Sequence, residues 1–148
     1  MARDSLKEML RRDEGVRAFV YDDANGCIIV PGSVVVGHPT IAVGRAADIN
    51  GLSDSEIEFL LDNDVARCEK ECAPFGWYNA LDEVRQDVIL SMCFNMGIHG
   101  LLGFKKMIEA LEQKNYEEAA NQMLLSLWSE QVGKRAFRLS EIMRLGKY

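Results

Sequence analysis

The sequence has few histidines, a residue on which many metal sites and hydrolases depend. Among 148 residues there are two histidines, His38 and His99, and each stands beside a glycine, which indicates loop positions. The chain lacks a Gly-x-Ser-x-Gly elbow, a Gly-rich phosphate loop and a His-Glu-x-x-His motif. These absences argue against serine hydrolases, phosphate-loop enzymes and zinc proteases, and we expect neither a metal nor a cofactor.

A long hydrophobic run is also lacking. The most apolar stretch, CIIVPGSVVVG at 27–37, is broken by Pro31, Gly32 and Ser33 and is far too short for a membrane span. The first residues, MARDSLKEMLRRDEG, are charged throughout and have no apolar signal core. We therefore expect no stable membrane insertion, and a protein that stays in the cytoplasm where it is made until another factor releases it.

Positive charge is scarce as well. The formal net charge is −6, from 17 Lys and Arg against 23 Asp and Glu. Residues 101–148 hold 8 basic and 6 acidic residues, a net +2, so the first hundred residues carry −8. Because phosphate contacts dominate nucleic-acid affinity, this balance argues against a nucleic-acid partner. The modestly basic C-terminal part is compatible with a neutral or anionic polymer.

Four cysteines are present, at positions 27, 68, 72 and 93. Without an export signal we interpret them as reduced, mostly buried thiols rather than disulfides. Cys68 and Cys72 share a helix face, but no histidine lies near them in the sequence, so core positions are favoured over a metal pair.

The N-terminal part predicts one helix followed by a small sheet. Ser5 and Glu8 form a capping box for a helix over 5–14, and Gly15 ends it. Three β-like runs follow, at 18–22, 27–30 and 33–43, with a hairpin signal at Asn25-Gly26. We predict a three-stranded antiparallel sheet.

The rest of the chain is predicted to be helical. A second capping box, Ser53 with Glu56, begins a long helix over 53–72. Later helices are expected at 81–97, 103–113, 116–128 and 133–146, the first with an apolar face of Leu81, Val84, Val88, Ile89, Met92 and Cys93. The prediction is a single α+β domain over 1–148: an N-terminal lobe at 15–50, a connecting helix at 53–72, and a C-terminal lobe at 73–148 packed with helix 5–14.

Glu14 occupies an unfavourable position at the end of the first helix. The C-terminal end of a helix carries partial negative charge, which disfavours a carboxylate and favours its protonated form. A protonated carboxylic acid is what a general acid requires. The alternative is a solvated surface residue near Arg11, Arg12 and Arg17, and position alone slightly favours that alternative.

A second carboxylate on the next element would complete a glycosidase pair, with one acid protonating the leaving oxygen and the other holding water. Asp22 and Asp23 are both available, on opposite faces of the predicted strand, and spacing does not choose between them. A plain polar turn is the other interpretation of this stretch.

Four segments resemble the phage-type lysozymes, or endolysins, of glycoside hydrolase family 24. In order, and covering nearly the whole chain, they are MLRRDEGVRAFVYDDANG, PTIAVGR, RQDVILSMCFNMGIHGLLGFKKMIEAL and YEEAANQMLLSLWSEQVGKRA. The resemblance implies a lysozyme-like fold and a bacteriolytic muramidase that hydrolyses the β-1,4 bond between N-acetylmuramic acid and N-acetylglucosamine in peptidoglycan. It assigns the general acid to Glu14 and, through the family's Tyr-x-Asp, the second carboxylate to Asp23.

The resemblance also implies that Thr40 helps to place the attacking water, because it matches the threonine of the family's Thr-Ile-Gly-x-Gly-His stretch. Seventeen positions separate Asp23 from Thr40, against a few in the family, so the sheet contains an insertion. The family's histidine is Arg45 here. The sheet either absorbs the insertion and returns Thr40 to its place, or Thr40 is displaced.

Further positions are implied to contact the glycan. Arg135 matches a family arginine that lies close to the catalytic glutamate, whereas helical periodicity alone favours core positions for Phe94, Met107 and Trp128. The implied substrate-binding residues are Ala46, Phe94, Asn95, Met107, Gln122, Gln131 and Arg135.

The resulting hypothesis is a monomeric endolysin, made in the host cytoplasm, that reaches the cell wall or periplasm with the help of a holin. Water entering opposite Glu14 would invert the anomeric centre, which predicts a carboxyl separation of roughly 6.5–9.5 Å rather than about 5 Å. Two alternatives remain: a lytic transglycosylase that uses one glutamate, and a catalytically silent glycan-binding or virion structural module.

Overall fold

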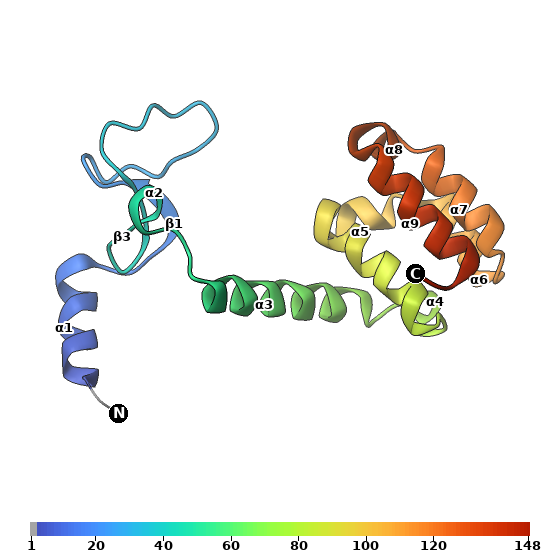
Figure 1. Ribbon diagram of the computed structural model, residues 1–148, viewed down its shortest axis with the longest axis horizontal. Coiled ribbons are helices and arrows are strands. Elements are labelled where there is room, and N and C mark those ends of the chain that lie inside the picture. Colours follow the sequence, from blue (N-terminus) through green and yellow to red (C-terminus); the bar gives the residue numbers. More distant parts are fainter. Residues whose placement is uncertain (1–2) are drawn as a thin grey trace. The chain divides into compact units, whose positions relative to one another are not determined.

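The computed structural model describes residues 3–148, and its backbone divides into two compact units. The N-terminal unit is Met1–Glu58 and the C-terminal unit is Phe59–Tyr148. The sheet belongs to the first unit, and the remainder of the chain is mostly helical (Figure 1). This is the predicted α+β, lysozyme-like fold class.

The N-terminal unit is built around three short strands. Its elements are α1 (Asp4–Glu14), β1 (Arg17–Asp22), β2 (Pro39–Ala42), β3 (Arg45–Ala46) and α2 (Ala47–Asn50). The strands pair in the order β1-β2-β3, and both pairings are antiparallel. In this register Tyr21 faces Thr40, and Thr40 faces Ala46. The three-stranded antiparallel sheet is confirmed.

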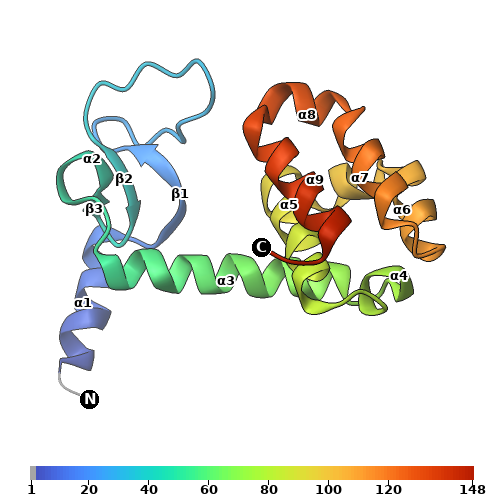
Figure 2. The same ribbon diagram turned by 45° about the vertical axis from the view of Figure 1, so that its right-hand side comes forward.

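Two of the three strands differ from the predicted ranges. Residues 27–30 form no strand and make only an isolated bridge between Tyr21 and Ile28, and the predicted run 33–43 is reduced to β2. The turn at Asn25-Gly26 is present, with the Gly26 N–H donating to the Asp22 carbonyl at 2.8 Å. Pro31 and Gly32 interrupt the ladder, and the chain continues as the long loop between β1 and β2 (Figure 2).

The two predicted capping boxes have different outcomes. The first is wrong: α1 begins at Asp4, after Arg3, and has no side-chain cap. The second is confirmed, because the Glu56 carboxylate accepts the Ser53 N–H at 2.8 Å and the Glu56 N–H donates to the Ser53 hydroxyl at 3.3 Å. It begins α3 (Asp54–Cys72), which runs from the N-terminal into the C-terminal unit.

The C-terminal unit is a group of helices around one apolar core. Its further helices are α4 (Gly76–Asn79), α5 (Glu83–Leu102), α6 (Lys105–Glu112), α7 (Tyr116–Leu124), α8 (Leu127–Val132) and α9 (Lys134–Leu145), with α7 packed along α6 and α9 (Figure 2). The backbone of α5 is non-helical at Gly97, and the helix expected over 116–128 divides because Ser126 caps α8. The predicted core face of α5 is largely confirmed: Val88, Ile89, Met92 and Cys93 are all buried.

The cysteine prediction is confirmed for three of four residues. Cys68, Cys72 and Cys93 are buried, Cys27 is exposed, and all four are free thiols. Burial raises the pKa of Cys72 and Cys93, which keeps both thiols protonated.

No single helix among residues 3–148 is long and apolar enough to cross a membrane. α5 and α6 pass that test only as a pair, on length and composition alone, with a bend of 97° between them.

Candidate functional site

Glu14 is the last residue of α1, and its side chain lies over the turn between β2 and β3. Gly15 stops the helix with φ 77°, and its N–H donates to the Arg11 carbonyl at 3.0 Å. At the turn, Gly44 has φ 65°, and a Cβ there would lie 2.9 Å from Glu14 Oε2. Gly44 therefore satisfies two requirements, a left-handed backbone and space for the Glu14 carboxyl group.

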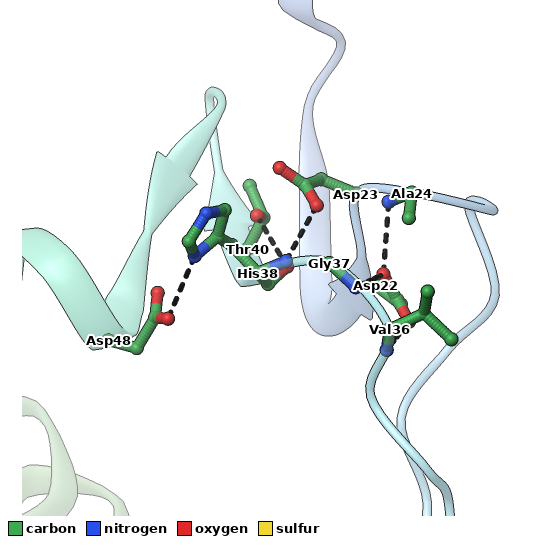
Figure 3. Close-up of polar contacts among 8 residues, drawn as sticks. All are labelled: Asp22, Asp23, Ala24, Val36, Gly37, His38, Thr40 and Asp48. Carbon is green, nitrogen blue, oxygen red and sulfur yellow. Dashed lines mark hydrogen bonds and ion pairs between the residues drawn. The ribbon is translucent and has the colours of Figure 1, made fainter.

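Asp23 and Thr40 meet at the backbone of His38. The Asp23 carboxylate accepts the His38 N–H at 2.7 Å, and the Thr40 hydroxyl donates to the His38 carbonyl at 2.9 Å. Figure 3 shows both side chains directed at this one residue. The insertion is thus looped out between Asp23 and His38, and Thr40 lies beside the end of β1, opposite Tyr21.

Asp22 and Asp23 have different environments although they are adjacent. Asp22 is 3% exposed, and its carboxylate accepts the backbone N–H groups of Ala24, Val36 and Gly37 at 2.7–3.0 Å. The bonds from Val36 and Ala24 lower the pKa of Asp22. Asp23 is exposed to solvent and accepts one backbone N–H among residues 3–148. Of the two, Asp23 is the carboxylate with room for substrate or water.

The His38 imidazole extends from the same residue towards α2. Its Nδ1 lies 2.9 Å from Asp48 Oδ2, and the hydrogen bond and charge of Asp48 raise the pKa of His38. The imidazolium consequently adds a positive charge near Asp23 at mildly acidic pH.

Arg45 connects β3 to the start of α3. Its guanidinium forms two bonds to Glu56, at 2.6 and 2.7 Å. These bonds, together with the bond from the Ser53 N–H, lower the pKa of Glu56 to about 2. Arg45, at the position where the resemblance implies a histidine, therefore forms a forked ion pair. Gly44, Arg45 and Glu56 line an open hollow of about 580 Å³, and Ala46 lies opposite Thr40 in the sheet.

In the C-terminal unit, two of the implied glycan contacts share one hollow. Met107 and Gln122 both line an open depression of about 530 Å³. Met107 is fully buried, as periodicity suggested, and Gln122 donates to Glu118 at 2.6 Å. Asn95 is joined to this hollow indirectly, because its Oδ1 accepts the indole N–H of Trp128, a lining residue, at 2.8 Å.

Phe94 and Arg135 line a different hollow of about 310 Å³, in which Arg135 donates to the Ser91 hydroxyl at 3.2 Å. Phe94 is 45% exposed, so it is not the core residue that periodicity favoured. Gln131 is exposed on α8 and lines neither of these two hollows. The implied proximity of Arg135 to Glu14 stays a prediction.

The sequence analysis missed several residues that build the site. Gly37 is one: a Cβ on it would overlap Asp23 Oδ1 and lie 2.8 Å from the Ala24 Cβ. Its φ is outside the left-handed region, so no turn pattern marks it. The His38–Asp48 pair was also missed, since ten positions separate the two residues and His38 looked like a simple loop histidine.

This geometry suits general acid-base chemistry at a glycosidic bond. Glu14 and Asp23 are two exposed carboxyl groups on neighbouring elements of one unit, and the Thr40 hydroxyl lies beside the second. One group can protonate a leaving oxygen while the other holds a water molecule.

Comparison with known proteins agrees with this chemistry. The phage lysozyme family matches residues 11–142. The chain is 29% identical to the probable T4-type lysozyme 1 of Dictyostelium discoideum, over 96% of this chain and 95% of that protein, and 28% identical to the probable T4-type lysozyme 2 with the same coverage. The pre-baseplate central spike protein Gp5 of Enterobacteria phage T4 is also 29% identical over 96% of this chain, but over only 28% of its own length. The chain therefore belongs to the phage lysozyme family, whose members are peptidoglycan hydrolases of the muramidase type.

Proposed function

We propose that this protein is an endolysin that cleaves the β-1,4 bond between N-acetylmuramic acid and N-acetylglucosamine in bacterial peptidoglycan. The observation that carries the proposal is the convergence of Asp23 and Thr40 on the His38 backbone, in the same unit as Glu14. This arrangement supports a role for all three despite the insertion.

In the proposed reaction, Glu14 donates its proton to the glycosidic oxygen as the bond to the anomeric carbon breaks. A water molecule attacks that carbon from the opposite face, oriented by Thr40 and losing its proton to Asp23. The products are a new hydroxyl on the leaving sugar and an inverted, reducing sugar. Proton nuclear magnetic resonance of a fresh digest tests the stereochemistry, since a retaining enzyme would release the opposite anomer first.

The proposal extends to the glycan contacts. Ala46, beside Thr40, and the hollow lined by Met107 and Gln122 are proposed subsites, with Asn95 supporting the Trp128 wall. Phe94, Gln131 and Arg135 are proposed contacts on the family resemblance. We also propose a monomer that is made in the host cytoplasm and reaches the wall through a holin.

The test is a mass spectrum of purified peptidoglycan after digestion with the wild type and with Glu14→Gln. We expect reducing-end muropeptides from the wild type and a loss of about 10²–10⁴-fold in the variant, the usual contribution of a general acid. Anhydro-muropeptides would identify a lytic transglycosylase instead. Binding to the sacculi without soluble product from either protein would identify a glycan-binding or virion module.

A further inference from the structure

Asp22 is more buried and has more hydrogen-bond donors than a carboxylate in a simple polar turn requires. It is 3% exposed, and its three backbone donors come from two separate segments. Ala24 lies two residues later, whereas Val36 and Gly37 lie fourteen and fifteen residues later. The bond from Ala24 alone would make an ordinary Asx turn, so the other two bonds require a separate explanation.

We propose that Asp22 is a positioning residue, whose carboxylate ties both ends of the inserted loop (residues 24–37) to the end of β1 and thereby fixes the Asp23 carboxylate through His38. The inference rests on the proposed role of Asp23 in placing water. Because the insertion lengthens this loop, its far end must be held at the site by a specific contact, and the Asp22 carboxylate makes that contact.

The bonds follow one another along the chain. The N–H groups of Val36 and Gly37 go to Asp22, and the next N–H, that of His38, goes to Asp23. Three consecutive peptide N–H groups thus donate hydrogen bonds to the carboxylates of two consecutive aspartates. Because His38 follows Gly37 directly, the bonds to Asp22 hold the segment that presents the donor of the Asp23 carboxylate (Figure 3). The Asp23 N–H adds a second bond at this point, to the His38 carbonyl at 3.1 Å.

The carboxylate is chemically suited to this anchor because both of its oxygens are used. Oδ1 accepts from Ala24 and Gly37, and Oδ2 accepts from Val36 at 2.7 Å. An asparagine side chain replaces one of these oxygens with an NH₂ group, which would face an N–H donor and cannot accept its bond. The lowered pKa of Asp22 agrees with a site that favours the charged form.

Thr40 is connected to the same anchor. Its hydroxyl donates to the carbonyl of His38, the residue whose N–H holds Asp23. Releasing the far end of the loop would therefore disturb both groups that are proposed to hold water, while Glu14 lies against the separate turn at Gly44. The expected defect is in the chemical step rather than in glycan binding.

The test compares Asp22→Asn with Asp62→Asn, which removes one charge from an exposed residue of α3. On soluble, uncross-linked glycan strands we expect Asp22→Asn to lower kcat by about 10²-fold, the scale of a 1 Å misplacement, with KM within about twofold of wild type. Hydrogen exchange should show faster exchange of the Val36, Gly37 and His38 amides, with α5 unchanged. Asp62→Asn should match the wild type in both measurements.

A second variant keeps the test valid if Asp22→Asn folds poorly. Val36→Pro removes one donor and leaves the aspartate in place, at a side chain that is 76% exposed. We expect a smaller fall in kcat and faster exchange at Gly37 and His38. Wild-type kcat and wild-type exchange in a folded Asp22→Asn or Val36→Pro protein would overturn the proposal.

Two further variants separate this proposal from the proposed function. Glu14→Gln and Asp23→Asn are measured on the same substrate. If both retain activity, the assignment of the catalytic groups is wrong. If both lose activity while Asp22→Asn keeps it, the catalytic assignment stands and only the anchor is wrong.

Discussion

Among residues 3–58 of the N-terminal unit, the two buried residues are Asp22 and Thr40, whereas the C-terminal unit buries a cluster of apolar side chains and one polar residue, Ser140. Apolar burial is non-directional and tolerates some change of shape, but hydrogen bonds fix donors and acceptors within tenths of an ångström. The comparison indicates that the C-terminal unit depends mainly on its core, while the local geometry of the proposed catalytic groups depends on polar contacts.

The largest expected effect concerns the apolar core of the C-terminal unit. Leu101→Ala removes a fully buried side chain of α5 and should lower the free energy of unfolding by about 2–5 kcal/mol. Leu145→Ala, at a position 57% exposed on α9, should change it by less than about 0.5 kcal/mol. Urea unfolding followed by tryptophan fluorescence measures both, because Trp77 and Trp128 both belong to the C-terminal unit. Equal losses in the two variants would contradict a core centred on α5.

The second effect concerns the polar contacts around Asp23, which the addition of one methyl group should disturb. Gly37→Ala places a Cβ on top of Asp23 Oδ1, so the carboxylate must move, and activity on peptidoglycan should fall by about 10²-fold. Thermal unfolding of the C-terminal unit should change little. Gly76→Ala is the matched control, since a Cβ there meets no atom within 4 Å and its φ is outside the left-handed region. Wild-type activity in Gly37→Ala would show that the position of Asp23 is not critical.

The smallest effect concerns the ion pair of Arg45 and Glu56. Bonds from Arg45 and from the Ser53 N–H lower the pKa of Glu56 from 4.5 to about 2 in the folded state, so these contacts of the charged carboxylate stabilise the N-terminal unit above pH 4.5. That contribution is lost as the pH falls from 4.5 towards 2. The melting temperature of Glu56→Gln, followed by circular dichroism, should be below that of the wild type at neutral pH, and the two should converge in this acid window. A difference that is constant from pH 7 to pH 3 would assign the loss to something other than ionisation.

Helical periodicity predicted the C-terminal unit well because the same apolar residues that define the pattern also form the core. Val88, Ile89, Met92 and Cys93 illustrate this on α5. The capping box at Ser53 was equally local, since its two partners are three residues apart. Ser5 with Glu8 failed although the pattern is the same, because α1 begins one residue earlier.

Family resemblance and structure contributed different parts of the proposed site. The resemblance selected Glu14, Asp23 and Thr40, and the structure brought Asp23 and Thr40 together around His38. Neither periodicity nor motif spacing indicated the importance of Gly37 or of the pairing of His38 with Asp48. The contacts of Gly37 with Asp23 and Ala24 span the insertion, and His38 and Asp48 lie ten positions apart, so neither contact follows a regular period.

The sequence alone determined the helical segments, the sheet region, the family and the carboxyl groups available for catalysis, since each depends on side-chain type and short-range spacing. Only the tertiary structure decided which neighbouring aspartate is buried, where the insertion goes and whether Thr40 returns to Asp23. The physical reason is that backbone N–H groups are the same in every non-proline residue. Which of them reach Asp22 and Asp23 depends on the path of the loop in space.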